Sequence, residues 1–235
     1  MVNLISSTQN EKIKEYAKLN EKKYRDETGL FIIEGSHLVE EAKQYNIIKE
    51  VITTNPKIEG TLVSEDVMKK LTNQKSVVEV AAICKKINKN EIKNKILILD
   101  TIQDPGNIGT LIRSAISFGF ETIVMENCAD IYSSKVLRAT QGAIFKLNII
   151  NAKIDNFISS LEGYKIYGTS LKNGVGLKTI EKAQKLAIIL GNEGNGVRDE
   201  LLDMTDKNIF IEITNMESLN VGVAGGILMY ELGGK

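Results

Sequence analysis

The chain has 235 residues, of which 43% are hydrophobic, and its 30 basic and 30 acidic side chains give a formal net charge of zero. This length suits one large domain or two modest ones, and the balanced charge argues against a protein that binds nucleic acid through a uniform positive field. Two cysteines without metal-ligand spacing and a single histidine argue against disulfides, zinc and histidine-based catalysis, so we expect no metal.

The first residues and the apolar runs indicate where the protein resides. Asn3, Ser6, Ser7 and Gln9 interrupt the N-terminus with polar side chains, so we expect no secretory leader. The longest clean apolar runs, such as 186–190, have the length of a strand and are too short to cross a bilayer. We therefore expect a cytoplasmic protein that makes no membrane contact.

The N-terminal part alternates between helical and strand-like patterns. Apolar spacing predicts helices over 10–25 and 37–45 and a third that ends near Leu71, and apolar runs predict strands over 30–33, 47–53 and 76–84. This alternation indicates a small α/β domain over residues 1–88. The segment 11–25 carries six basic residues against three glutamates, a pattern that suits either a solvated helix or a phosphate-contacting face.

A second α/β domain is expected over residues 95–235, after a polar linker at 85–95. The predicted strands are 96–99, 122–125, 145–149, 165–169, 186–190 and 209–213, and the predicted helices are 107–118, 133–141, 153–161 and 219–232. Strands that are short continuous apolar runs are typical of a parallel sheet covered on both faces.

Three turns rich in glycine and asparagine each follow a strand-like run, at 104–109, 191–196 and 217–226. The third turn leads into a helix that carries glycines at 222, 225 and 226, although each glycine inside a helix costs about 1 kcal/mol relative to alanine. Such a cost is accepted where a ligand or a partner helix approaches the backbone closely. We interpret the three turns as one ligand site assembled from separate loops.

Each turn carries side chains with possible roles in such a site. Asn107 and Arg113 lie at the start of a helix, where a phosphate can bind, although a surface arginine paired with a carboxylate has the same pattern. Glu193 can accept hydrogen bonds from a ligand or cap a helix. Ser218 suits a helix N-cap, whereas Asn220 has less structural reason to stand inside the predicted helix. Neither a phosphate loop nor the dinucleotide fingerprint fits the second turn.

Together the three motifs resemble those of the SpoU/TrmH group of SPOUT-class RNA ribose 2′-O-methyltransferases. That family has Asn and Arg where this chain has Asn107 and Arg113, a Gly-x-Glu-Gly-x-Gly turn matched by 191–196, and Ser-Leu-Asn-Val matched by 218–221. The motifs occur in the family's order. The N-terminal domain also resembles the family's substrate-binding domain, which is related to RNA-binding ribosomal proteins, through the stretch 31–35 and the helix after it.

The resemblance implies a trefoil-knotted C-terminal domain with a parallel sheet, a homodimer, and methylation of a ribose 2′-hydroxyl with S-adenosylmethionine as the cofactor. It implies that this cofactor is held by the residues Leu190, Gly191, Ile211, Leu219 and Val221. It assigns the reaction to Arg113 near the ribose and its phosphate, with Asn107, Glu193, Ser218 and Asn220 shaping the site. Arg113 is either a general base or a group that orients the hydroxyl, and the cost of deprotonating an arginine favours the second role.

Three alternatives remain at this point. The substrate implied by the N-terminal domain is ribosomal RNA, most of all 23S rRNA, and transfer RNA is the alternative substrate. A non-catalytic RNA-binding protein on the same fold is a second reading, which the joint presence of the five reaction-site residues disfavours. A nucleotide-binding enzyme of Rossmann type is a third, which lacks support because no glycine-rich turn of the right order follows the first strand.

Overall fold

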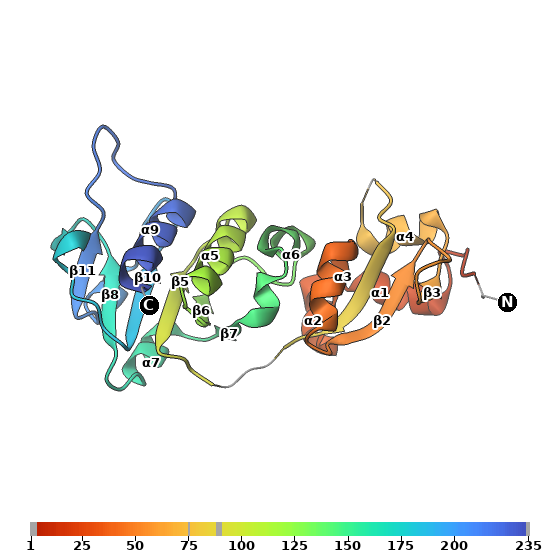
Figure 1. The fold of residues 1–235 in the computed structure, drawn as a ribbon, viewed down its shortest axis with the longest axis horizontal. Coiled ribbons are helices and arrows are strands. Elements are labelled where there is room, and N and C mark those ends of the chain that lie inside the picture. Colours follow the sequence, from red (N-terminus) through yellow and green to blue (C-terminus); the bar gives the residue numbers. More distant parts are fainter. Residues whose placement is uncertain (1–3, 75, 88–90, 234–235) are drawn as a thin grey trace. The chain divides into compact units, whose positions relative to one another are not determined.

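The chain folds into two compact units in the computed structural model, which describes residues 4–74, 76–87 and 91–233 (Figure 1). The first unit contains the described residues up to Ile87 together with Asp130–Phe145, and the second contains the described remainder. The segment Asp130–Phe145, which the sequence pattern places in the second domain, therefore packs with the first unit.

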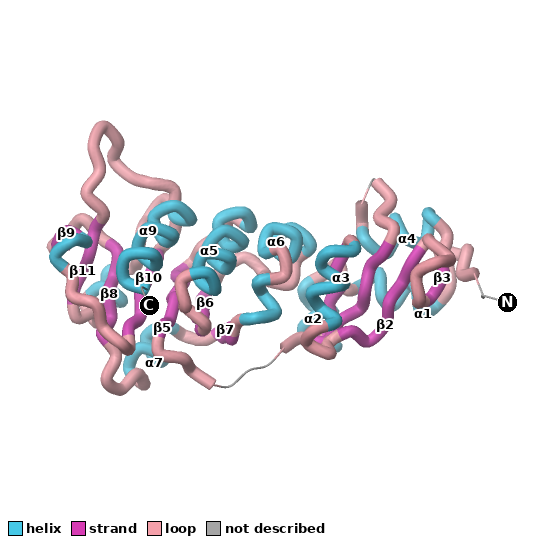
Figure 2. Tube along the Cα trace, viewed as in Figure 1, coloured by secondary structure: helices cyan, strands magenta, loops and turns pink. Residues whose placement is uncertain are grey.

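A four-stranded sheet forms the centre of the first unit (Figure 2), in the order β1-β4-β2-β3. Its strands are β1 (Leu30–Glu34), β2 (Ile48–Thr53), β3 (Thr61–Leu62) and β4 (Val80–Lys85). Strand β4 is antiparallel to both neighbours, and β2 and β3 are parallel. The helices of this unit are α1 (Glu11–Lys18), α2 (Lys22–Thr28), α3 (Ser36–Lys43), α4 (Glu65–Thr72) and α6 (Ser134–Thr140).

The predicted helix over 10–25 is wrong as a single element, because the chain turns between α1 and α2. Leu19 is buried at the turn, and the side chain of Asn20 donates hydrogen bonds to the carbonyls of Ala17 and Leu71, at 3.0 and 2.8 Å. An asparagine that bonds the backbone in this way competes with helix formation. The predicted strand over 76–84 begins only at Val80, and residue 75 lies outside the described residues.

Two arginines join the segment Asp130–Phe145 to the rest of the first unit. Arg25 is 5% exposed and donates to Asp130, with its Nε 3.1 Å from a carboxylate oxygen, and also to the carbonyl of Leu19. Arg138 on α6 donates to the buried Glu34 at 3.1 Å. Arg25 is thus used inside the unit, and Lys12 is paired with Glu50 at 2.6 Å, which leaves four exposed lysines of segment 11–25 for any contact with phosphate.

Seven parallel strands form the sheet of the second unit, in the order β7-β6-β5-β10-β8-β11-β9. They are β5 (Lys95–Asp100), β6 (Thr122–Glu126), β7 (Asn148–Asn151), β8 (Lys165–Thr169), β9 (Gly174–Gly176), β10 (Leu186–Leu190) and β11 (Lys207–Phe210). The helices are α5 (Pro105–Ser117), α7 (Ile154–Ser159), α8 (Asp199–Leu202) and α9 (Val221–Gly233), with a short 3-10 helix η2 (Leu177–Thr179). The predicted parallel sheet is confirmed.

The order of the strands reverses next to β5. The chain places β6 and β7 on one side of β5, continues with β8 on the other side, and then inserts β10 between β5 and β8. In open parallel sheets, ligands bind beyond the carboxyl ends of the strands at such a reversal. The loops that follow β5 and β10 lie at this point.

Several boundaries differ from the predicted ones. The strand predicted over 145–149 begins at Asn148, because Ala143–Lys146 forms the 3-10 helix η1, and the strand predicted over 209–213 is Lys207–Phe210. Strand β9 and helix α8 were not predicted, since three and four residues are too short for a periodic pattern. The last helix begins at Val221 rather than at 219.

The glycines of α9 allow it to pack closely against α5 and β10. A Cβ atom on Gly225 would lie 2.3 Å from Leu111 of α5 and 2.7 Å from Leu190 of β10. A Cβ on Gly222 would lie 3.2 Å from Thr110. Helix-to-helix packing therefore explains Gly222 and Gly225, which the sequence analysis assigned to either a ligand or a partner helix.

Candidate active site

A pocket of about 560 Å³ opens beyond the carboxyl ends of β8, β10 and β11. Its volume is within the range of small-molecule sites. All five residues predicted to hold the cofactor line it: Leu190, Gly191, Ile211, Leu219 and Val221. Glu193, Ser218 and Asn220 line it as well. The second and third motifs are thus brought together around one cavity.

The glycine-rich loop after β10 closes on itself. Asn192 and Gly196 exchange two backbone hydrogen bonds of 3.0 and 2.9 Å, and the side-chain oxygen of Asn192 accepts from the backbone N–H of Gly194 at 2.9 Å. A Cβ atom on Gly191 would lie 2.0 Å from the carbonyl carbon of Gly196, so only glycine fits at position 191. This self-closed turn presents its backbone to the pocket.

A chain of three polar side chains joins the three motifs. Asn107 on α5 donates to Glu193 at 2.9 Å, and Asn220 donates to the side-chain oxygen of Asn107 at 2.9 Å. Burial alone would raise the pKa of Glu193, but the hydrogen bonds from Asn107 and from backbone N–H groups lower it overall. Glu193 is therefore held as a carboxylate at the edge of the pocket.

Asn220 has a structural role that the sequence analysis missed. Its side-chain oxygen accepts hydrogen bonds from the backbone N–H groups of Gly222 and Val223, at 2.9 and 3.3 Å. These are the N–H groups of the second and third residues of α9, so Asn220 is the N-cap. The interpretation of Ser218 as the N-cap is wrong, because the helix begins two residues later than an N-cap at 218 would require.

Arg113 lies apart from this chain of side chains. It follows Asn107 on the same helix by less than two turns, and its side chain is exposed. Within the described parts of the chain, no hydrogen bond or ion pair joins its guanidinium to another side chain, and it does not line the pocket. An exposed guanidinium is available to a group from outside the unit, such as a phosphate.

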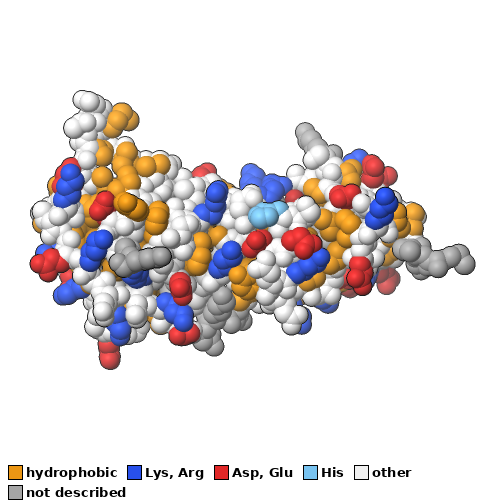
Figure 3. All heavy atoms as spheres, viewed as in Figure 1, with side chains coloured by type: hydrophobic (Ala, Val, Ile, Leu, Met, Phe, Trp, Pro, Cys, Tyr) orange, Lys and Arg blue, Asp and Glu red, His pale blue; other side chains and the backbone are white. Residues whose placement is uncertain are grey.

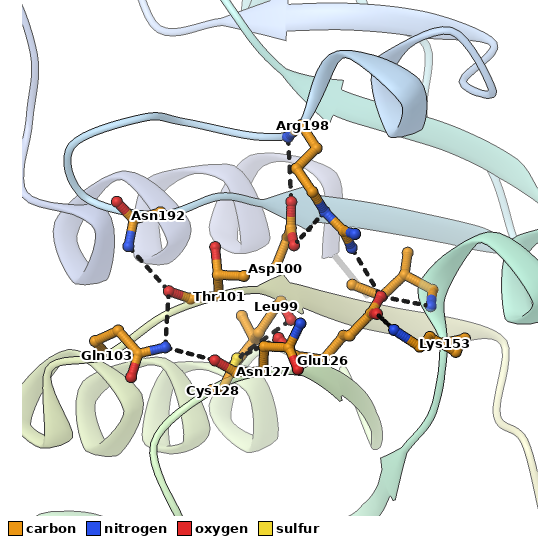
Figure 4. A network of polar contacts seen from close by, with 11 residues as sticks. Leu99, Asp100, Thr101, Gln103, Glu126, Asn127, Cys128, Lys153, Asn192 and Arg198 are labelled. Atoms are coloured by element: carbon orange, nitrogen blue, oxygen red, sulfur yellow. Dashed lines mark hydrogen bonds and ion pairs between the residues drawn. The ribbon is translucent and has the colours of Figure 1, made fainter.

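A second polar network lies beside the pocket (Figure 4), and the sequence analysis did not find it. Arg198, at the end of the glycine-rich loop, donates through Nε to Asp100 at 2.9 Å and through a terminal nitrogen to Glu126 at 2.7 Å. Asp100 and Glu126 are the last residues of the neighbouring strands β5 and β6. The sequence feature that could have indicated this network is the pair of acidic residues that end two apolar strands. The carboxyl ends of parallel strands meet at one edge of the sheet, so such residues lie close together.

Among the described residues, no group of three or more His, Cys, Asp and Glu side chains is arranged to hold a metal ion. Over those same parts of the chain, no helix has the length and apolar character needed to cross a membrane.

Both parts of the chain match known protein families. The SpoU rRNA Methylase family profile matches residues 94–230, and the profile of the MRM3-like substrate binding domain matches residues 10–91. The chain is 38% identical over 245 aligned positions to the 23S rRNA (guanosine(2553)-2′-O)-methyltransferase RlmP of Bacillus subtilis. That alignment covers 98% of this chain and 99% of the relative.

Solved structures agree with the profiles. The rRNA methyltransferase of Sinorhizobium meliloti superposes with a TM-score of 0.88 at 28% identity, over 98% of this chain and 96% of that one. The same enzyme with AdoMet bound gives a TM-score of 0.87 at 28% identity, over 98% and 97% of the two chains. The profile match and the relative similar over its whole length show that the chain belongs to the SpoU rRNA methylase family.

Proposed function

We propose that this protein transfers a methyl group from S-adenosylmethionine to a ribose 2′-hydroxyl of 23S ribosomal RNA. The observation that carries the proposal is the alignment of almost the whole chain with almost the whole of the Bacillus subtilis enzyme, whose name states this reaction. The proposal includes a substrate-binding domain over residues 1–88 and a methyltransferase domain over 95–235.

The residues of the pocket fit S-adenosylmethionine. The apolar side chains of Leu190, Ile211 and Leu219 suit an adenine ring, and the carboxylates of Glu193 and Glu217 suit a ligand with cationic groups. Gly191 keeps the loop backbone free of a side chain at the pocket wall. When bound, S-adenosylmethionine supplies a methyl group on a sulfonium.

The chain's own residues have positioning roles in this reaction. Asn107, Glu193 and Asn220 form the hydrogen-bonded chain that fixes the loops around the pocket, and Ser218 adds a hydroxyl to its wall. Arg113, exposed on α5, holds the RNA phosphate and orients the ribose hydroxyl. Because removing the proton from a guanidinium is costly, we assign it this orienting role and not that of a base. Alignment of the nucleophile then provides much of the rate enhancement.

The experiment that tests the proposal is transfer of labelled methyl from S-adenosylmethionine to ribosomal and transfer RNA fractions that lack the modification. Label in 23S rRNA that maps to an alkali-resistant dinucleotide supports ribose methylation. Label in transfer RNA alone would replace the proposed substrate. Cofactor binding with no label in either naked RNA would move the substrate to a ribonucleoprotein particle, and no cofactor binding at all would favour a non-catalytic RNA-binding protein.

The proposal extends to a homodimer with α9 at its interface. Val223 and Tyr230 of this helix are 50% and 64% exposed, and Figure 3 shows hydrophobic side chains gathered over the region of α9. Exposed apolar side chains grouped on one surface indicate an interface. Light scattering after size-exclusion chromatography tests this: a mass near twice 26.0 kDa is expected, and a mass of one chain contradicts it.

Two further parts of the proposal rest on the family. A trefoil knot, formed where the loops after β10 and β11 line the same pocket, is supported by the insertion of β10 between β5 and β8. A cytoplasmic location is supported by the proposed substrate, which is found there. Fluorescent tagging of the protein in cells tests the location.

A further inference from the structure

Both ends of the glycine-rich loop after β10 are hydrogen-bonded to the carboxyl end of strand β5. At its start, the side chain of Asn192 donates to the carbonyl of Thr101 at 3.0 Å. At its end, Arg198 bonds Asp100 twice, with its backbone N–H 3.1 Å from one carboxylate oxygen and its Nε 2.9 Å from the other. Four of the five residues between these two attachments, Glu193 to Gly196, line the pocket, and the fifth, Val197, is buried.

The fastening point on β5 is itself rigid. The side chain of Asp100 is fully buried, and it pairs in register with Glu126 of β6. Thr101 has a positive φ of 59°, which is uncommon for a residue with a branched side chain, and its N–H donates to the carbonyl of Glu126 at 2.9 Å. The contacts around Thr101 therefore hold it in a conformation that it would not adopt alone.

The two neighbouring carboxylates need cations. Asp100 and Glu126 are buried side by side, and like charges at this range disfavour each other. Arg198 bridges the two carboxylates, and Lys153 binds the other oxygen of Glu126 at 2.7 Å. A planar guanidinium can bind two carboxylates in fixed directions, which a lysine ammonium cannot do. Arg198 is thus the cation that links the loop to both strands.

We propose that Arg198 is a positioning residue for S-adenosylmethionine, acting by fixing the loop backbone against the carboxyl ends of β5 and β6. The inference rests on the proposed function, since it assumes that the pocket holds this cofactor. Arg198 does not line the pocket, so its effect passes through the loop. It therefore determines how well the cofactor binds and has less influence on the methyl transfer once the cofactor is bound.

The test compares three full-length variants with the wild type. Arg198→Gln removes the cation, Arg198→Lys keeps the cation without the planar fork, and Lys153→Met removes the other cation of Glu126 without touching the loop. Isothermal titration calorimetry gives the Kd for S-adenosylmethionine, and labelled methyl transfer to 23S rRNA gives KM and kcat. Thermal melting without ligand reports the folding of each variant.

Arg198→Gln is expected to raise the Kd and the KM for the cofactor about 10- to 100-fold, as removal of one partner from buried charged hydrogen bonds can do, with a smaller change in kcat. Arg198→Lys should recover part of the loss, and Lys153→Met should change the Kd less than twofold. If Arg198→Gln fails to fold, the comparison of Arg198→Lys with Lys153→Met decides the question.

Three results would overturn the inference. Wild-type Kd in both Arg198 variants would show that the loop holds its position without the arginine. An equal loss of affinity in Lys153→Met would assign the effect to the charge network as a whole. A wild-type protein that does not bind S-adenosylmethionine would contradict both the proposed function and this inference. If the wild type binds it, the affinities of the variants test the role of Arg198 alone.

Discussion

Asn107 on α5 donates a hydrogen bond of 2.9 Å to Glu193, a residue 86 positions later in the chain. The same asparagine accepts a hydrogen bond from Asn220, so one amide side chain joins three loops. An amide side chain can donate and accept at once, whereas an ionised carboxylate can only accept. The relative position of the three motifs therefore depends on Asn107.

The first prediction concerns this asparagine. Asn107→Ala removes a donor from Glu193 and an acceptor from Asn220, so the pKa of Glu193 should move back up from its lowered position. A net hydrogen bond contributes about 1 kcal/mol, so methyl transfer should fall about fivefold or more. The measurement is kcat/KM for the cofactor. Asn156→Ala, an exposed asparagine of α7 outside both the pocket and this chain of bonds, is the control variant.

The second prediction separates two roles of Arg113. If the guanidinium orients the phosphate and the hydroxyl, Arg113→Lys should keep roughly a tenth of the wild-type kcat, because the ammonium still binds phosphate as a point charge. Arg113→Ala should lose about 100-fold or more, as expected when a positioning contact is removed. Single-turnover methyl transfer at saturating cofactor is the measurement. Equal losses in both variants would argue for a role that only a guanidinium can perform.

The third prediction is a pH dependence of stability that comes from Glu126. Burial acts to raise its pKa, but hydrogen bonds from the backbone N–H of Ile154, from Lys153 and from Arg198 lower it to about 2. The folded protein holds this carboxylate ionised below the pH at which the unfolded chain takes up the proton. The stabilisation is therefore complete above about pH 4.5 and is lost as the pH falls toward 2.

Urea unfolding between pH 7 and pH 3 measures this dependence. The free energy of unfolding of the wild type should fall as the pH drops below about 4.5, and Glu126→Gln should show a smaller fall over the same range. The difference between the two proteins is expected to be at most about 3 kcal/mol. Glu121→Gln is a suitable control, since Glu121 immediately precedes β6 and is not among the partners of Lys153, Ile154 and Arg198 in this network. Parallel curves for the wild type and Glu126→Gln would contradict the prediction.

The fourth prediction contrasts two adjacent glycines of α9. Gly225→Val should destabilise the protein by about 1–3 kcal/mol, because its side chain would meet Leu111 and Leu190 in the packed core. Gly226→Ala should stabilise it by up to about 1 kcal/mol, because its Cβ meets only the Ser114 hydroxyl, at 3.6 Å, and alanine favours the helix. Thermal melting of both variants checks the contrast, and equal changes would show that α9 does not pack as described.

Secondary structure was predicted correctly where the sequence has a regular pattern, and it was missed where it depends on a contact between distant residues. Continuous apolar runs located β5, β6, β8 and β10, whereas β9 escaped because its three residues, Gly174–Gly176, have no apolar pattern. The helix over 10–25 was predicted as one because its spacing is regular, and only the contact of Asn20 with Leu71, 51 positions away, shows why it breaks.

The same distinction holds for the site. The three turns were found from their glycines and asparagines; the structure places the second and third around one pocket and joins the first to them through the hydrogen bonds of Asn107. The pairing of Asp100 with Arg198 was not predicted, because the two residues are 98 positions apart and no local pattern specifies which charged side chains pair across that distance. The N-cap role of Asn220 depends on the first residue of α9, and helix boundaries are poorly defined by sequence.

The position of β10 has a consequence for synthesis on the ribosome. Because β10 lies between β5 and β8 yet follows both in the chain, the facing edges of those two strands stay unpaired until residue 190 has left the exit tunnel. Both strands are largely buried in the finished sheet, so the growing chain carries two exposed apolar edges while β6, β7 and β8 are already complete. This interval is when the nascent protein is most exposed to aggregation and to capture by chaperones.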